Sequence, residues 1–420
     1  MATSKKGSSR EDNERMKPEK QQMNAKTKAK KKRKRIILFV VEIFILLIML
    51  VVLYGVLKTG KIDKVTIDEE EVGINAKVEE SKAMEGYRNI ALFGVDARNG
   101  ALGKGTRTDT VMIASINEKT HDVKLVSVYR DTYLNLGNDS YNKCNAAYAK
   151  GGPKQAITML NMNLDLNITD YVTVGFKGLV DTINELGGVE IDVDEAEISH
   201  LNNYQSCIAE DLNYDYKPVK STGLQLLDGM QATAYCRIRY TKGDDFKRAE
   251  RQREVLMAVA EKAKKAKAST LDSIANKVFP QVSTSLDLDE ILSLLGNIAQ
   301  YNVGENTGFP FTSNRGTGNV SGKGSCVIPQ TLEQNVVLLH EFLFTEEAYT
   351  VSDAVKEYSA QVASDTAGAS KKPSKKADKE ENLGLLEAGS VEDGGAKAVE
   401  TPAEPAPAEP APEEVPVVVE

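Results

Sequence analysis

Residues 171–193 read YVTVGFKGLVDTINELGGVEIDV, and this stretch decides the fold class. Two runs rich in valine and isoleucine, at 170–176 and 189–193, are typical of β-strands. Between them, residues 177–188 have helical spacing and end in two glycines, which is a helix stop signal. A strand, a helix and a second strand in this order predict an α/β protein, in which helices pack on a sheet.

The same alternation continues on both sides of this stretch. Apolar runs at 89–96, 111–117 and 123–129 predict strands, and EKTHD at 118–122 predicts the hairpin connection between the last two. We therefore expect a sheet covered by helices on its faces. A glycine-, serine- and asparagine-rich segment at 313–325 is interpreted as a loop. Helical spacing recurs at 152–164, 246–266, 286–299 and 331–344.

Residues 36–57 form an apolar run with a single charge, Glu42. As a helix this run would be roughly 33 Å long, which is enough for a bilayer core of about 30 Å. Residues 1–35 carry fourteen Lys/Arg against four Asp/Glu, which predicts a cytoplasmic amino terminus. We therefore expect a signal-anchored protein of the cell membrane with an extracytoplasmic domain. The expected parts are a basic arm at 1–35, a transmembrane helix at 36–57, a stalk at 58–85, a domain at 86–360 and a disordered Pro/Ala/Glu-rich tail at 361–420.

The four cysteines show no CxxC spacing, which argues against a zinc site. Cys207 and Cys326 lie in loop-like contexts, and an extracytoplasmic location permits us to predict a disulfide between them. Cys144 and Cys236 adjoin predicted strands and are expected to be small buried hydrophobic residues. The three histidines lack cysteine or carboxylate companions at ligand spacing, so neither a histidine-centred metal site nor a catalytic triad is expected.

Charged groups of both signs follow several predicted strands, at 94–110, 129–133, 142–152 and 237–253. Strand ends are where ligands bind in open α/β sheets. For any single Asp–Arg pair, simple ion pairing is the leading interpretation. The alternative is a divalent cation such as Mg²⁺ held by two carboxylates, with arginines that bind phosphate oxygens through bidentate hydrogen bonds. Phosphoryl transfer requires that combination of positioning and charge stabilisation.

These segments also resemble a known family. The resemblance to the LytR–CpsA–Psr family of cell-envelope proteins covers residues 86–262 and keeps the family's blocks in order. It implies a three-layer α/β/α sandwich with a central mixed sheet, preceded by one transmembrane helix. It also implies transfer of an anionic glycopolymer from an undecaprenyl-diphosphate carrier to peptidoglycan by phosphoryl transfer. The matching blocks are NIALFGVDAR, GTRTDTVMIASIN, VKLVSVYRDTYLNL, KCNAAYAKGG, YVTVGFKGLVDTINELGGVEIDV, LDGMQATAYCRIRY and DDFKRAERQREVL.

The family motifs assign roles to individual residues of this chain. By this resemblance Asp96 and Asp109 are Mg²⁺ ligands. We expect a carboxylate to take the proton of the attacking hydroxyl, and Asp96, Asp131 and Asp244 are the open candidates. The sequence departs from the family pattern at Lys247, where glycine is common, and in VYRDT, where IPRDT is usual. The predicted catalytic residues are Arg107, Arg130 and Asp131. The predicted pyrophosphate-binding residues are Arg98, Arg107, Arg130, Lys143, Arg237, Arg239, Arg248 and Gln252.

The basic stretch RIRYTKGDDFKRAERQR at 237–253 is expected to have an inner and an outer side. Arg237 and Arg239 would share one face of a strand, because side chains two residues apart on a strand point the same way. Arg248 and Gln252 are four residues apart on a predicted helix and would also share a face. The remaining cations are interpreted as solvent-facing, namely Lys242, Lys247, Arg251 and Arg253.

The lipid chain of such a carrier requires an apolar channel. The helical face formed by Ile157, Met159, Leu160 and Met162 could line it, although an ordinary core is the favoured interpretation. Which glycopolymer is transferred, teichoic acid, capsule or another, stays open. A pyrophosphate hydrolase, a non-catalytic envelope scaffold and a transcriptional attenuator are the alternatives. The last is disfavoured because only residues 1–35 would be cytoplasmic and they contain no DNA-reading motif.

Overall fold

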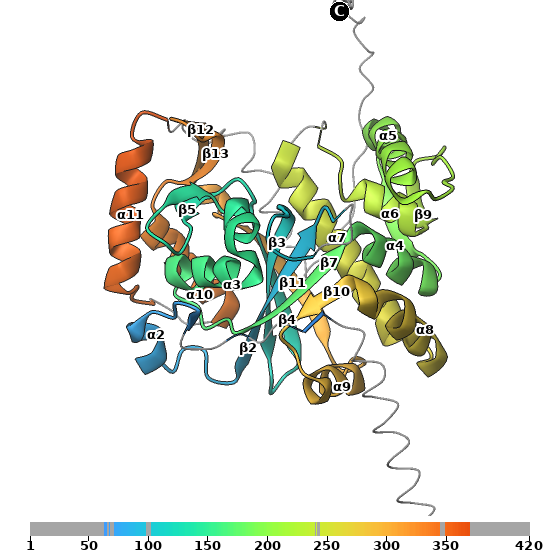
Figure 1. The fold of residues 1–420 in the computed structure, drawn as a ribbon, viewed down its shortest axis with the longest axis horizontal. Helices are drawn as coiled ribbons and strands as arrows, with labels where there is room; N and C mark the ends of the chain where they lie inside the picture. The colour runs from blue at the N-terminus through green and yellow to red at the C-terminus, as the bar shows by residue number, and fades with distance from the viewer. Residues whose placement is uncertain are drawn as a thin grey trace, which may run out of the picture. The chain divides into compact units, whose positions relative to one another are not determined.

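A seven-stranded sheet forms the centre of the protein, with the strand order β1-β10-β7-β2-β3-β4-β11 (Figure 1). The computed structural model describes residues 63–64, 67, 71–97, 102–239, 241, 244–344 and 349–369. The strands of this sheet are β1 (Asp63–Lys64), β2 (Tyr87–Val95), β3 (Thr108–Asn117), β4 (Asp122–Val128), β7 (Asp170–Gly175), β10 (Val282–Thr284) and β11 (Asn302–Phe309).

The sheet is mixed, as expected. Strand β2 is parallel to β7 and antiparallel to β3, and β4 is antiparallel to β3 and parallel to β11. The predicted hairpin at 118–122 is confirmed, because Asn117 Oδ1 accepts hydrogen bonds from the backbone amides of Lys119 and Thr120 and closes the turn. As a result β2, β7, β4 and β11 all end at the same edge of the sheet.

Helices cover both faces of the sheet (Figure 1). Side chains alternate between the two faces along each strand, and both faces carry apolar residues that the helices bury. Phe93 and Ile113 pack in the larger core against α3 (Asn145–Leu164) and α10 (Leu332–Phe344). The neighbouring Leu92 and Ile90 point the other way and pack with residues of α7 (Asp244–Lys264) and α9 (Leu288–Gly296). This is the mixed α/β arrangement that the strand–helix alternation predicts.

A lateral unit with its own core adjoins β7. It contains α4 (Phe176–Glu185), α5 (Glu195–Leu212), α6 (Gly229–Tyr235) and the two-stranded sheet of β8 (Val189–Val193) and β9 (Gly223–Leu227). Helix α5 begins with a capping box in which the side chains of Asp194 and Glu197 bond each other's backbone amides. The strand at 189–193 therefore exists but pairs with β9 and stays outside the central sheet. Helix α8 (Ala268–Val278) and the 3₁₀ helix η2 (Phe279–Gln281) lead from α7 to β10.

The segment expected to be a loop at 313–325 contains a second hairpin. Here β12 (Arg315–Val320) pairs with β13 (Gly324–Pro329), after the 3₁₀ helix η3 (Thr312–Asn314). Alternate residues of this hairpin, Val320, Cys326 and Ile328, are buried, so its small polar residues occupy the outer positions of two real strands. Helix α11 (Asp353–Thr366) packs behind the hairpin and runs across position 360, where the sequence analysis ended the domain. The remaining elements are α2 (Ala76–Glu80), β5 (Tyr133–Asn135) and β6 (Tyr141–Lys143).

The predicted basic arm at 1–35 and transmembrane helix at 36–57 lie outside the described residues, as does almost all of the predicted tail. In the part of the chain that the structure does describe, no helix combines the length and the apolar content needed to cross a membrane.

The cysteine predictions were half right. Cys144 and Cys236 are buried, as expected for small hydrophobic residues. The disulfide between Cys207 and Cys326 is wrong: both thiols are free, because Cys207 lies on the exposed side of α5 while Cys326 is buried in β13.

Candidate functional site

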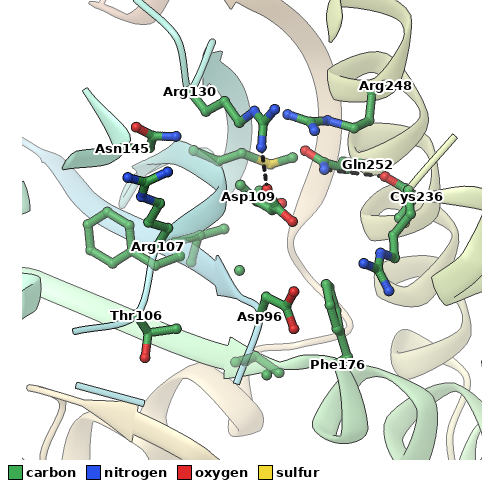
Figure 2. Close-up of a pocket in the computed structure, with 18 of the residues that line it drawn as sticks. Asp96, Thr106, Arg107, Asp109, Arg130, Asn145, Phe176, Cys236, Arg248 and Gln252 are labelled. Carbon is green, nitrogen blue, oxygen red and sulfur yellow. Dashed lines mark hydrogen bonds and ion pairs between the residues drawn. The ribbon is translucent and has the colours of Figure 1, made fainter. Parts of the chain in front are cut away.

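A cavity of about 1220 Å³ opens at the carboxyl ends of β2 and β7, between the sheet and helices α4 and α7 (Figure 2). Every predicted metal-ligand, pyrophosphate and catalytic residue that the structure describes lines this cavity; Arg98 lies outside the described residues. The strand ends converge because β2, β4 and β7 run in the same direction. The residues brought together are Asp96, Arg107, Asp109, Arg130, Asp131, Lys143, Arg237, Arg239, Arg248 and Gln252.

Asp109, on β3, is one centre of the charge network. Its Oδ1 accepts a hydrogen bond of 2.6 Å from Arg130 Nη1, and Arg239 Nη2 lies 3.4 Å from the same oxygen (Figure 2). Arg130 lies two residues beyond the end of β4 at Val128. Burial lowers the pKa of Arg130, but the nearby carboxylates, Asp109 foremost, outweigh this effect and raise it. Arg130 is therefore held as a cation at the cavity wall.

Asp245, in the first turn of α7, is a second centre that sequence reasoning missed. Its Oδ1 lies 3.3 Å from Arg248 Nη1 and 3.9 Å from Arg239 Nε, and its Oδ2 lies 3.9 Å from Arg130 Nε. The signal for it was the three-residue spacing from Arg248 on one helix. Asp244, which the sequence analysis considered instead, is exposed, has a φ of 46° and does not line the cavity.

Several guanidinium groups at this end of the cavity are incompletely satisfied. Arg130 Nε, Arg237 Nη1 and Arg248 Nε are buried and have no hydrogen-bond partner among the described residues. Burial, followed by the charge of Arg130, lowers the pKa of Arg248 to about 10, so this cation is destabilised where it stands. Leaving a buried donor unpaired costs about 1–3 kcal/mol. A multivalent anion in the cavity would remove that cost at several groups together.

Arg237 and Arg239 do not lie on a strand, which corrects the sequence prediction. Helix α6 ends at Tyr235, and the amides of Arg237 and Ile238 donate to carbonyl oxygens of α6 at 3.0 and 3.3 Å, which makes this segment a turn. The Arg237 guanidinium stacks 4.6 Å above the ring of Phe176, the first residue of α4. A flat cation on an aromatic face is fixed in direction while its outer N–H groups remain available.

Arg251 holds this turn in place from behind. It is almost fully buried at 1% exposure, forms a 2.7 Å ion pair with Glu197 of α5, and donates to Ile238 O at 3.2 Å and Thr241 Oγ1 at 2.7 Å. The prediction that Arg251 faces solvent is therefore wrong. Its partner Glu197 lies far away in the sequence, so helical spacing could not reveal the pair.

The other cations of the basic stretch divide between inside and outside. Arg253 is also buried, contrary to prediction, and donates from Nε to Asn306 Oδ1 of β11 at 2.8 Å. Lys247 is on the surface as predicted, paired with Glu250 at 3.0 Å. Lys242 lies outside the described residues.

Another buried arginine supports α7 from the hairpin side. The Arg315 guanidinium lies 4.0 Å from the ring centre of Phe246, and its Nη1 donates to the hydroxyl of Tyr129 at 2.9 Å. Tyr129 and Phe246 pack edge to face at 4.7 Å between ring centres. Because Tyr129 precedes Arg130 and Phe246 follows Asp245, this stack fixes the two segments that carry those groups. Its partners are distant in sequence, so no local pattern pointed to Arg315.

Asp131, Lys143 and Arg107 also line the cavity, and Asp131 Oδ2 lies 3.9 Å from Arg130 Nε. Lys143 Nζ lies 3.5 Å from Asp131 Oδ1. Figure 2 shows Arg107 beside Asn145, at the side of the cavity facing Asp96. On the α7 side, Gln252 Nε2 donates to Cys236 O at 3.4 Å, which links α7 to the turn after α6 (Figure 2).

The far end of the cavity is apolar. Its lining comes from the sheet face opposite α3 and from α4 and α7, and the ordinary core favoured for Ile157, Met159 and Leu160 is confirmed. Those three side chains are fully buried in the core on the other side of the sheet. The apolar lining consists of Leu92, Met112, Val172, Val174, Leu179, Leu256 and Val259.

The donor set suits a hard divalent cation that shares its coordination sphere with a ligand. Asp96 follows β2, Asp109 lies near the start of β3, and both carboxylates line the same cavity (Figure 2). Within the described ranges no group of three or more His, Cys, Asp or Glu side chains could hold a metal by itself. Mg²⁺ usually takes only one or two protein carboxylates and completes its shell with water and substrate phosphates. The residues present are compatible with that arrangement.

Comparison with known proteins gives a consistent picture. The family model LytR_cpsA_psr matches residues 49–331. The chain is 32% identical over 197 residues to the polyisoprenyl-teichoic acid–peptidoglycan teichoic acid transferase TagV of Bacillus subtilis, covering 46% of this chain and 48% of that protein. It is 33% identical over 223 residues to the TagU transferase of the same name from Oceanobacillus iheyensis, covering 50% and 62%. The match thus spans about half to three fifths of these relatives.

A solved structure of TagT bound to LI-WTA shares the fold. The TM-score is 0.51 at 23% identity, and the superposition covers 67% of this chain and all of that one. The mixed α/β architecture is thereby confirmed.

Proposed function

The chain belongs to the LytR_cpsA_psr family, and we propose that it transfers an anionic glycopolymer from a polyprenyl-diphosphate carrier to peptidoglycan. The names of the relatives TagV and TagU describe this reaction with teichoic acid as the polymer. The observation that carries the proposal is the cavity itself. At one end lie buried guanidinium groups whose N–H donors have no hydrogen-bond partner among the described residues, and at the other end the lining is apolar.

Such a cavity matches a lipid diphosphate, which has an apolar chain at one end and a charged head group at the other. The prenyl chain would lie against Leu92, Val172 and Leu256, because burying apolar surface contributes about 25 cal/mol per Å². The diphosphate would lie where Arg130 and Arg248 converge, since guanidinium groups form paired, charge-assisted hydrogen bonds with phosphate oxygens. One ligand would then relieve the unpaired donors and fill the apolar end.

The proposed reaction balances as a phosphoryl transfer. A hydroxyl of a peptidoglycan sugar attacks the phosphorus that carries the glycan. The bond from that phosphorus to the bridging oxygen breaks, polyprenyl phosphate leaves, and a phosphodiester joins the glycan to peptidoglycan. Arg130 and Arg107 would stabilise the charge on the transferred group and the leaving phosphate, which is the main contribution that proteins make to this chemistry.

We propose Asp96 and Asp109 as the residues that hold Mg²⁺, with the diphosphate completing its shell. Bound there, Mg²⁺ would neutralise phosphate charge and polarise the reacting group. Asp109 would then exchange its contact with Arg130 for the metal and free that guanidinium for the substrate. The hydroxyl proton would pass to Asp131, because Asp96 is committed to the metal and Asp244 does not line the cavity.

We also propose that the domain lies outside the cytoplasmic membrane, anchored by the apolar run at 36–57. The basic arm before that run supports this orientation. The proposed substrates support it too, since peptidoglycan lies on that side.

The test is a transfer assay with the purified full-length chain, a radiolabelled polyprenyl-diphosphate glycan and peptidoglycan oligomers, with and without Mg²⁺. We expect label to reach peptidoglycan in the wild type, and both Arg130→Ala and Asp109→Ala to abolish this with the fold preserved in circular dichroism. Label released as free phosphoglycan would instead identify a hydrolase. Unchanged transfer in both variants would refute the site.

A further inference from the structure

The hairpin of β12 and β13 forms part of the cavity rim. Its tip residues Gly322 and Lys323 line the cavity together with Asn142 and Lys143 of the β5–β6 ribbon. Lys143 adjoins the arginines through Asp131, whose carboxylate oxygens lie 3.5 Å from Lys143 Nζ and 3.9 Å from Arg130 Nε. A prenyl-diphosphate-glycan, placed with its tail in the apolar end, therefore presents its glycan to this rim.

The hairpin is rigidly attached to the backbone that carries the catalytic candidates. Val327 donates its amide to Asp131 O at 2.9 Å, and Thr132 forms a bridge with Val327. Buried Val320, Cys326 and Ile328 anchor the hairpin on Val362 of α11. The tip turns through Gly322 and Gly324, whose φ angles of 70° and 74° favour glycine. Lys323 is thus carried at a defined place at the rim.

The rim has a surplus of positive charge. Lys143 pairs with Asp131, whereas Lys323 forms no ion pair with any carboxylate in the described part of the chain. Lys323 and Lys143 both line the same cavity, which places the two ammonium groups at one rim. An ammonium group held half-buried at a cavity mouth attracts anions more strongly than one on an open surface.

We propose that Lys323 and Lys143 form a subsite for a phosphate group of the glycan, beyond the diphosphate. This inference rests on the proposed function. It adds that the transferred glycan carries a negatively charged group close to the diphosphate. The hairpin tip then selects phosphate-bearing glycans over neutral ones.

The experiment measures binding of three probes to the full-length chain in detergent micelles by fluorescence titration. The probes are a prenyl diphosphate, the same carrier with a neutral disaccharide, and that carrier with a glycerol-phosphate group on the disaccharide. We expect the phosphate-bearing probe to bind about twofold to fivefold more tightly than the neutral one, the range of a partly exposed ion pair. Lys323→Ala should remove this advantage and Lys323→Glu should reverse it. Added salt should weaken it, because the pair is screened.

Lys119→Ala is the matched control, since Lys119 is an exposed lysine in the β3–β4 hairpin turn, away from the cavity lining. It should leave the advantage unchanged. An advantage that persists in Lys323→Ala overturns the subsite. So does a Lys323→Ala variant that keeps donor affinity but raises the KM for peptidoglycan, because the rim would then bind the acceptor. Failure of wild type to bind prenyl diphosphate refutes the proposed function instead, so the two failures are distinguishable.

Discussion

Two arginines at opposite ends of the central sheet show what separates a structural ion cluster from a ligand site. Arg88, at the start of β2, donates from Nε and Nη2 to Asp170 Oδ2 at 3.1 and 2.7 Å and also contacts Glu290. Arg130, after the end of β4, is similarly exposed, 18% against 23% for Arg88. Yet Arg130 Nε is buried with no hydrogen-bond partner in the described residues, whereas no buried nitrogen of Arg88 lacks a partner there.

Burial of an arginine therefore does not identify a ligand site by itself, whereas the ratio of cations to carboxylates around it does. At the Arg88 end, one arginine contacts two carboxylates. At the Arg130 end, arginines and a lysine from several elements outnumber the carboxylates among them, Asp109, Asp131 and Asp245 included. An anion would stabilise such an excess of cations held together by the fold, which is why we assign this end to a diphosphate.

The largest effect is expected at Arg251, which is the most buried of the described arginines and uses Nε, Nη1 and Nη2 in hydrogen bonds. Arg251→Gln should lower the free energy of unfolding by about 3–5 kcal/mol, because it leaves Glu197 charged and buried without its partner. Denaturant unfolding of the full-length chain measures this. The double variant Arg251→Gln/Glu197→Gln should recover a substantial part of the loss. If Arg251→Gln alone changed the free energy of unfolding by less than about 0.5 kcal/mol, the range of neutral surface changes, this arginine would not be structural.

Arg130→Gln and Arg88→Gln should show opposite behaviour. We expect Arg130→Gln to lower kcat/KM for transfer by about 10²–10³-fold, the usual cost of removing one group that stabilises transition-state charge, with little change in stability. Arg88→Gln should lower stability by about 1–3 kcal/mol, the cost of an unsatisfied partner, and leave transfer intact. Transfer assays and unfolding curves on the same preparations decide. Equal losses of activity in both variants would remove the distinction between the two ends.

His340 shows that an unpaired buried atom is not by itself a ligand site. Its Nε2 donates to Leu164 O at 3.0 Å, its Nδ1 has no partner among the described residues, and it does not line the cavity. Burial lowers its pKa from 6.5 to about 4. The unfolded chain therefore takes up the proton first, and stability should fall by about 3 kcal/mol as the pH drops from 6.5 to 4. Unfolding curves at pH 7, 5.5 and 4 should show a shallower fall for His340→Gln; an identical fall would contradict this.

The smallest effect concerns the apolar end of the cavity. Leu179→Ala removes part of its lining, and it should weaken binding of a long-chain prenyl diphosphate by about 1 kcal/mol, or about fivefold. A two-isoprene diphosphate that does not reach this end should bind both proteins equally. Competition binding with the two probes measures the difference. Equal weakening for both chain lengths would place the lipid chain elsewhere.

Much of this organisation could be predicted from the sequence because it follows local patterns. Strand-like runs such as 89–96 end in charged residues, and strands that run in one direction end at one edge of the sheet, so Asp96, Arg130 and their companions had to meet. The family blocks added the residues of α7, and Arg248 and Gln252 do share one helix face.

What failed depended on contacts between distant segments. Arg251 and Arg253 have the spacing of a solvent-facing helix surface, but Glu197 and Asn306 draw them into the interior. The strand expected around Arg237 is a turn because α6 continues to Tyr235 and its carbonyl groups capture the next amides. The glycine-rich segment at 313–325 became a hairpin because α11 covers its buried side.

Binding of prenyl ligands that differ only in the head group tests the central claim most directly. The full-length chain in micelles is titrated with a prenol, the prenyl monophosphate and the prenyl diphosphate of one chain length. We predict that affinity rises at each step and that Arg248→Gln removes most of the gain between prenol and diphosphate, because the unpaired guanidinium groups bind the anion. Equal affinity for prenol and diphosphate, or an unchanged gain in Arg248→Gln, would contradict the account.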